Sequence, residues 1–78
     1  MKKYTAQKII EVQKPNVKSA FIFKAKLYAE EGDTIHCIPN EGLRDIFTLT
    51  NISKGNLSVI ADRYEIDLLI KNNYIKEI

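Results

Sequence analysis

Few residues in this sequence are of the types that carry out catalysis or hold a metal ion. The chain has one histidine, His36, beside one cysteine, Cys37. The stretch around them is typical of a buried strand, where neighbouring side chains point to opposite faces, so we do not expect the pair to act together. A zinc site needs several convergent ligands, and a single thiol cannot form an internal disulfide. The sequence therefore predicts no metal site and no disulfide-bonded scaffold.

Carboxylates are the other candidates for catalysis. Asp62, Glu65 and Asp67 lie close together near the C-terminus, but nothing in the pattern indicates a cleft that would raise the pKa of one of them. We interpret them as acids at the start of a helix, where they complement the helix dipole. The three glycines are too far apart to form a phosphate-binding loop. We therefore expect no catalytic residues, no enzyme activity and no cofactor.

The best candidate for a functional surface is one face of the segment from Val17 to Ala29. Lysines around an exposed aromatic side chain can dock an acidic protein surface, with apolar residues as anchors. They can also follow a nucleic-acid backbone and stack a base. A solvated strand face, whose lysines discourage edge-to-edge pairing, would show the same pattern. The candidate partner-binding residues are Lys18, Ile22, Lys24, Lys26 and Tyr28.

Charge is distributed unevenly along the chain. Residues 1–26 contain seven lysines and one acid, whereas residues 27–78 contain five bases and nine acids. The formal net charge of the whole chain is only +2. The asymmetry favours an anionic partner or a dipolar surface, although folding can intermix the two halves.

Turn-forming residues divide the chain into short segments. Proline, glycine and asparagine mark turns at residues 14–16, 30–33, 39–42 and 54–56. Between them, apolar and polar residues alternate, which predicts strands. The expected strands are Tyr4–Val12, Val17–Ala29, Asp33–Ile38, Arg44–Ser53, Leu57–Ala61 and Tyr74–Ile78.

The segment over residues 17–31 decides the fold class. As a helix it would be capped by Asn16 and ended by Gly32, but Lys24 would fall in the middle of its apolar face. As a strand it has one face without any charge. We therefore favour a strand and keep an α+β fold, with residues 17–31 helical, as the alternative. The uncharged face would consist of Val17, Ser19, Phe21, Phe23, Ala25, Leu27 and Ala29.

The C-terminal residues predict a helix followed by the last strand. Ile66, Leu69 and Ile70 recur at helical spacing, which favours a helix from about Glu65 to Asn72. We expect these three side chains to close one end of the core. A helix-turn-helix over residues 57–78 is the alternative, but its recognition helix would be short and would carry a single base.

Two short motifs carry a resemblance to a known group of proteins. Residues 32–35 are Gly-Asp-Thr-Ile, and residues 69–78 are Leu-Ile-Lys-Asn-Asn-Tyr-Ile-Lys-Glu-Ile. With the order of elements, they resemble small SH3-like barrels encoded by phages and prophages of AT-rich bacteria, in which glycine is commoner at the position of Asn73. The resemblance covers roughly residues 25–78. It implies a mostly β fold, a small antiparallel SH3-like barrel with one short helix before the last strand, but no single activity.

Size and composition set the remaining expectations. Seventy-eight residues allow a single domain, residues 1–78, and a core this small leaves a homodimer open. No apolar run approaches the ~20 residues of a membrane span, so we expect a cytoplasmic protein with no membrane partner. We predict a non-enzymatic phage or mobile-element accessory protein that binds, and in doing so can inhibit, a host protein. A small nucleic-acid-binding module that uses the basic strand face is the alternative.

Overall fold

The computed structural model describes residues 1–17, 22–55 and 57–78, with residues 14–17 and 22–25 described by their backbone alone. Its elements follow the chain in a simple order. They are β1 (Lys2–Ala6), β2 (Ile10–Val17), β3 (Ile22–Ala29), β4 (Thr34–Pro39), β5 (Ile46–Asn51), the 3-10 helix η1 (Ile52–Lys54), β6 (Leu57–Asp62), α1 (Arg63–Lys71) and β7 (Ile75–Glu77).

The strands form two antiparallel sheets. One has five strands in the order β6-β5-β4-β1-β7, and the other is the β2–β3 hairpin. The prediction of a mostly β fold with one short helix before the last strand is confirmed, and the α+β alternative with residues 17–31 helical is wrong because β3 spans Ile22–Ala29. In the described part of the chain no strand pairing joins the two sheets, so hydrogen bonding does not close them into a barrel.

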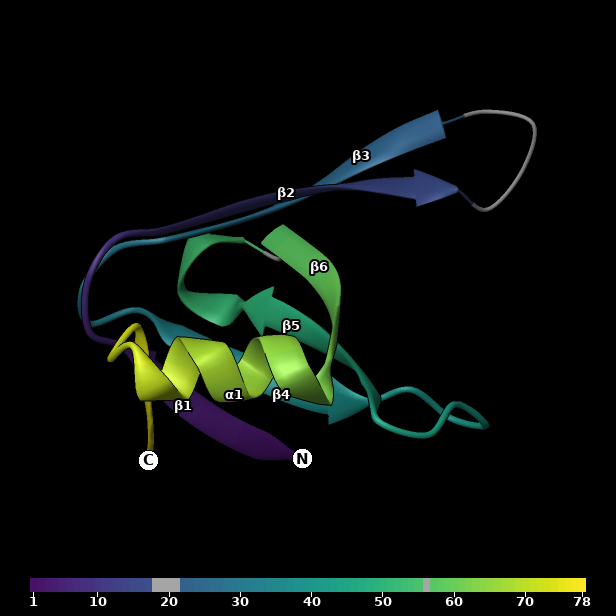
Figure 1. Ribbon diagram of the computed structural model, residues 1–78. Coiled ribbons are helices and arrows are strands. Elements are labelled where there is room, and N and C mark those ends of the chain that lie inside the picture. Colours follow the sequence, from purple (N-terminus) through teal and green to yellow (C-terminus); the bar gives the residue numbers. More distant parts are fainter. Residues whose placement is uncertain (18–21, 56) are drawn as a thin grey trace.

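The hairpin extends from the body of the protein like an arm. Its ladder has eight pairs, from Ile10↔Ala29 at the base to Val17↔Ile22 at the far end. Figure 1 shows β3 passing next to β6, with both chain termini on the opposite side of the molecule. Only the base of the hairpin therefore rests on the five-stranded sheet.

The N-terminal segment differs from its prediction in two ways. The single strand expected over Tyr4–Val12 is two strands, β1 and β2, which belong to different sheets. The chain leaves the first sheet where the Gln7 amide donates to the Tyr74 carbonyl at 2.8 Å. The turn expected at residues 14–16 is also wrong, because Pro15 lies inside β2 opposite Lys24. Proline is tolerated there because β2 pairs on one side only.

The core lies between the hairpin base, the inner face of the five-stranded sheet and α1. The predicted alternation is confirmed where side chains are described: Leu27 and Ala29 are buried, whereas Lys26 is exposed. The same alternation buries one side of each strand in the larger sheet. The buried apolar residues are Tyr4, Ala6, Ile10, Leu27, Ala29, Ile35, Cys37, Leu49, Val59, Ala61, Ile66 and Ile75.

The helix α1 forms where the local signals predicted it, but it begins two residues earlier, at Arg63. The Asp62 carboxylate accepts from the Glu65 amide at 2.8 Å, and the Glu65 carboxylate accepts from the Asp62 amide at 3.2 Å. This capping box satisfies two amides at the start of the helix. At the other end Asn73 has φ 61°, a left-handed conformation that asparagine tolerates.

The helix covers the core with fewer residues than predicted. Ile66 is fully buried and Leu69 packs against the core, but Ile70 is 41% exposed, so its predicted role in closing the core is wrong. Ile70 is the eighth residue of this nine-residue helix, more than two turns from its start, and lies at the edge of the core. The helix-turn-helix alternative is wrong as well, because residues 57–62 form strand β6.

Candidate functional site

The structure describes the predicted partner-binding residues to different extents. Lys18 lies outside the described residues. Ile22 and Lys24 belong to β3, where the backbone register places them opposite Val17 and Pro15. The other two, Lys26 and Tyr28, are described in full and lie on the outer side of the hairpin base, as the alternation predicted.

Lys26 is exposed but is not an isolated cation. Its side chain is 44% exposed, and its ammonium nitrogen lies 3.8 Å from the Glu11 carboxylate of the neighbouring strand. The same nitrogen lies 5.9 Å from the centre of the Tyr28 ring. An exposed ion pair contributes little to stability, but the negative charge of Glu11 offsets the positive charge of Lys26. The face at the hairpin base is therefore mixed in charge and aromatic, and less basic than the sequence suggested.

Tyr28 connects this face to a polar cluster at the turn between β3 and β4. The Tyr28 hydroxyl donates to the Glu30 carboxylate at 3.3 Å. Partial burial raises the pKa of the Tyr28 hydroxyl, and the nearby Glu30 charge raises it further. The hydroxyl is therefore a neutral hydrogen-bond donor near neutral pH.

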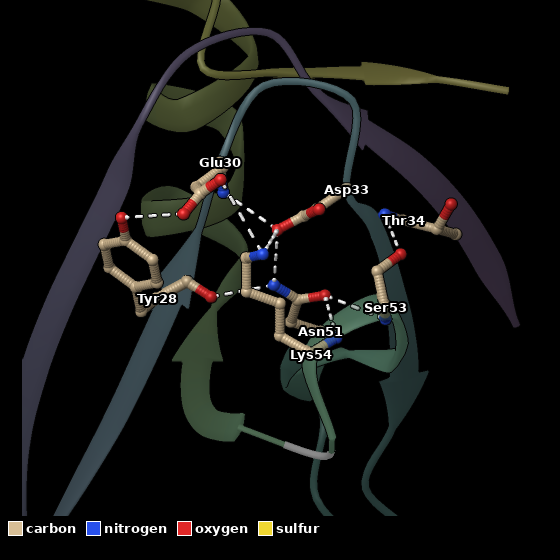
Figure 2. Close-up of polar contacts among 7 residues, drawn as sticks. All are labelled: Tyr28, Glu30, Asp33, Thr34, Asn51, Ser53 and Lys54. Carbon is tan, nitrogen blue, oxygen red and sulfur yellow. Dashed lines mark hydrogen bonds and ion pairs between the residues drawn. The ribbon is translucent and has the colours of Figure 1, made fainter.

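The cluster is centred on Asn51, the one buried polar residue in the described part of the chain. Figure 2 shows its side chain between the β3–β4 turn and η1. The amide nitrogen donates to the Tyr28 carbonyl at 2.8 Å and to the Asp33 carboxylate at 3.1 Å. The amide oxygen accepts from the backbone amides of Ser53 at 2.9 Å and Lys54 at 3.2 Å. Asn51 therefore satisfies all its hydrogen-bonding groups and fixes Tyr28 relative to the sheet.

Charges around Asn51 are balanced locally. The Lys54 ammonium lies 3.7 Å from the Glu30 carboxylate and 3.9 Å from the Asp33 carboxylate (Figure 2). The Glu30 amide donates to Asp33 at 2.9 Å, and this bond together with the Asn51 amide lowers the pKa of the Asp33 carboxyl. Each of these side chains has a partner within the cluster, so the cluster positions Tyr28.

The sequence prediction missed the parts of this site that come from elsewhere in the chain. Glu11, Asp33 and Lys54 are distant from β3 in sequence, and no local pattern brings them to it. Asn51 did carry a signal, because it occupies an inward position in the alternation of β5, and a polar residue at such a position indicates a buried hydrogen-bonding role.

The other residues considered for chemistry have structural surroundings. Cys37 is 4% exposed and His36 is half-buried, and they occupy successive positions on β4. Burial raises the pKa of the Cys37 thiol, so the thiol is not an activated nucleophile. Asp62 and Glu65 form the capping box of α1. Among the described residues no group of three potential metal ligands converges.

In the described ranges no helix has the length and apolar character needed to cross a membrane. No family model matches the chain, and neither the curated proteins nor the solved structures include a significant match.

Proposed function

We propose that this protein is a non-enzymatic binding module that contacts a partner protein through the outer side of the β2–β3 hairpin. The observation that carries the proposal is the pairing of Lys26 with the Tyr28 ring on an arm that only its base attaches to the core. A two-stranded hairpin is marginally stable in water, and a partner that covers it would stabilise it. The resemblance in the sequence supports a host protein as the partner of a phage or mobile-element accessory protein.

The charges at the hairpin base favour a protein over a nucleic acid. Protein interfaces are enriched in aromatic anchors, and their charged groups are arranged to complement charges of the partner. A surface that binds a phosphate backbone needs an excess of cations, because affinity comes from the neutralisation of phosphates. Here Glu11 lies against Lys26, and Glu30 accepts a hydrogen bond from the Tyr28 hydroxyl. Both carboxylates would repel a phosphate backbone.

Affinity capture from a host lysate tests the proposal when a variant of the hairpin is compared with the wild type and with a control variant. The test variant is Lys26→Glu/Tyr28→Ala. The matched control, Lys71→Glu/Tyr64→Ala, makes the same chemical changes on α1, where both residues are exposed. We expect a stoichiometric partner that the wild type and the control retain and the hairpin variant loses. Equal capture by all three proteins, or no stoichiometric partner, would contradict the proposal.

Nucleic-acid binding is the second candidate, supported by the cation beside the Tyr28 ring. It predicts that a fluorescently labelled single-stranded oligonucleotide binds, and that its affinity falls steeply between 50 and 200 mM salt as phosphate contacts are lost, roughly 10³-fold for six contacts. Fluorescence anisotropy at the two salt concentrations separates the candidates, because we expect no salt-dependent binding from the mixed face described above.

A further inference from the structure

A small cavity lies at the end of the core opposite the hairpin arm. Its volume is about 210 Å³, and it lies between β1, β4, β5 and the first residue of α1. The wall is mainly apolar, with Phe47, Pro39 and Met1 as its larger apolar side chains. Four residues with polar groups line it as well: Lys2, Tyr4, Cys37 and Arg63.

Among the described residues the Tyr4 hydroxyl has no hydrogen-bond partner, although Tyr4 is only 1% exposed. No described residue donates to it or accepts from it. Among the described side chains, every nitrogen or oxygen atom that is inaccessible to solvent has a hydrogen-bond partner. The hydroxyl must therefore open onto the cavity that Tyr4 lines. A buried hydroxyl without a protein partner costs free energy unless water or a ligand satisfies it.

Arg63 supplies a cation at the same cavity. Its guanidinium lies 4.6 Å from the centre of the Phe47 ring, which fixes it at the cavity rim. No carboxylate among the described side chains is close enough to form an ion pair with it. Lys2 also lines the cavity, but its ammonium lies 3.9 Å from Glu77. Arg63 is therefore an exposed cation at the cavity rim, without an ion-pair partner among the described side chains.

The groups around the cavity favour an anion over a cation. Burial raises the pKa of the Tyr4 hydroxyl and of the Cys37 thiol, so both are neutral donors near neutral pH. The Arg63 charge acts against this rise in pKa at both groups, with Lys2 and the N-terminal ammonium at Cys37, whereas the Glu77 and Asp67 carboxylates add to the rise at Tyr4. The cavity thus combines the Arg63 cation, the N-terminal ammonium of Met1, the neutral Tyr4 hydroxyl and apolar walls.

We propose that this cavity binds a small carboxylate with an apolar body, such as an aromatic acid of benzoate size. Arg63 would receive the carboxylate, for which its planar guanidinium offers two parallel donors, and the Tyr4 hydroxyl would donate to the same group. Phe47 and Pro39 would contact the apolar body. An apolar cavity of about 150 Å³ holds a benzene molecule, so 210 Å³ suffices for a ring and its carboxylate.

Titration of the ¹⁵N-labelled protein with sodium benzoate, followed by amide chemical shifts, tests this proposal. We expect saturable shifts at the amides of Tyr4, Cys37 and Phe47. Benzyl alcohol, with the same ring and no charge, should bind about tenfold more weakly or worse, because the charge-assisted bonds to Arg63 are lost. Equal affinity for the two probes, or shifts elsewhere, would overturn the proposal.

Two variants separate the contributions of Arg63 and Tyr4. Arg63→Gln should weaken benzoate binding about ten- to hundredfold and leave benzyl alcohol binding unchanged, whereas Arg44→Gln removes an exposed guanidinium away from the cavity and should change neither. Tyr4→Phe keeps the ring and should weaken benzoate by several-fold. Wild-type affinity for benzoate in Arg63→Gln would overturn the proposal. Should Arg63→Gln not fold, the comparison of the two probes with wild type and Tyr4→Phe still decides.

Discussion

Replacement of Asn51 by aspartate changes a single group at the centre of the polar cluster. The side chains have the same shape, so the acceptor bonds from the Ser53 and Lys54 amides remain. The two donor bonds, to the Tyr28 carbonyl and the Asp33 carboxylate, are lost. A fully buried carboxylate oxygen then faces Asp33 across the 3.1 Å that the amide nitrogen now spans.

The cost of this change follows from the geometry. Two negative charges 3.1 Å apart repel by about 5 kcal/mol at an effective dielectric constant near 20. Protonation of one carboxylate at pH 7 costs less, about 4 kcal/mol for an ordinary pKa near 3.9. The pair therefore shares a proton, and the lost bond to Tyr28 adds about 1 kcal/mol. The total is about 5 kcal/mol at pH 7, a large part of the roughly 4–12 kcal/mol expected for a domain of this size.

The same reasoning fixes the pH dependence. In the variant the folded state binds one proton more than the unfolded state between pH 5 and pH 7, so its stability falls as the pH rises. The cost should shrink by about 1.4 kcal/mol per pH unit and reach about 2.5 kcal/mol at pH 5. Urea unfolding at pH 5, 6 and 7, with wild type measured beside the variant, gives these differences directly.

Asn40→Asp provides the matched control, because Asn40 uses its side-chain oxygen to accept from the Thr48 hydroxyl at 2.7 Å and an aspartate can accept in the same way. We expect a small cost that does not change with pH. A cost of Asn51→Asp that is equal at pH 5 and pH 7 would refute the placement of Asn51 beside the Asp33 carboxylate.

Three further predictions test the packing, a helix end and one carboxyl group. Ile66→Ala should lower the free energy of unfolding by about 2–5 kcal/mol, because Ile66 is fully buried, and urea unfolding measures this loss. Asn73→Ala should cost about 1 kcal/mol and Asn73→Gly nothing, because φ is 61° there; equal stability of the two variants would argue against the left-handed conformation. Hydrogen bonds from the Glu30 amide and Asn51 lower the pKa of Asp33, so its contribution to stability is present above the ordinary value of 3.8 and is lost as the pH falls below it. Between pH 5 and pH 2 the free energy of unfolding of Asp33→Asn should fall less than that of the wild type. An equal fall in the two proteins would contradict the lowered pKa.

Local sequence patterns were sufficient to predict segments that bury a single face or that carry clear residues for a helix end. The alternation in residues 22–29 predicted β3, since Leu27 and Ala29 turn inward and Lys26 outward. The helix α1 was predicted from the spacing of Ile66, Leu69 and Ile70 and from the acids near its start, two of which the structure shows to form a capping box. In both segments the information lies within a few residues.

Tertiary context decided what the sequence could not. The break between β1 and β2 depends on contacts of Ala6 with Asp33 and of Gln7 with Tyr74, which are distant in sequence. Pro15 is typical of turns but pairs opposite Lys24, because one side of β2 is an edge. The mixed charge of the candidate site has the same origin, since Glu11 reaches Lys26 only through the register of the hairpin.

The most direct test of the proposed binding surface is to locate it on the protein. The captured partner is added to the ¹⁵N-labelled protein, and the amide signals that change on binding are assigned. We expect the changes to be largest at Glu11, Lys26 and Tyr28, which share the outer side of the hairpin base. Changes confined to α1 or to β7, with the hairpin signals unmoved, would contradict the proposal that the hairpin binds the partner.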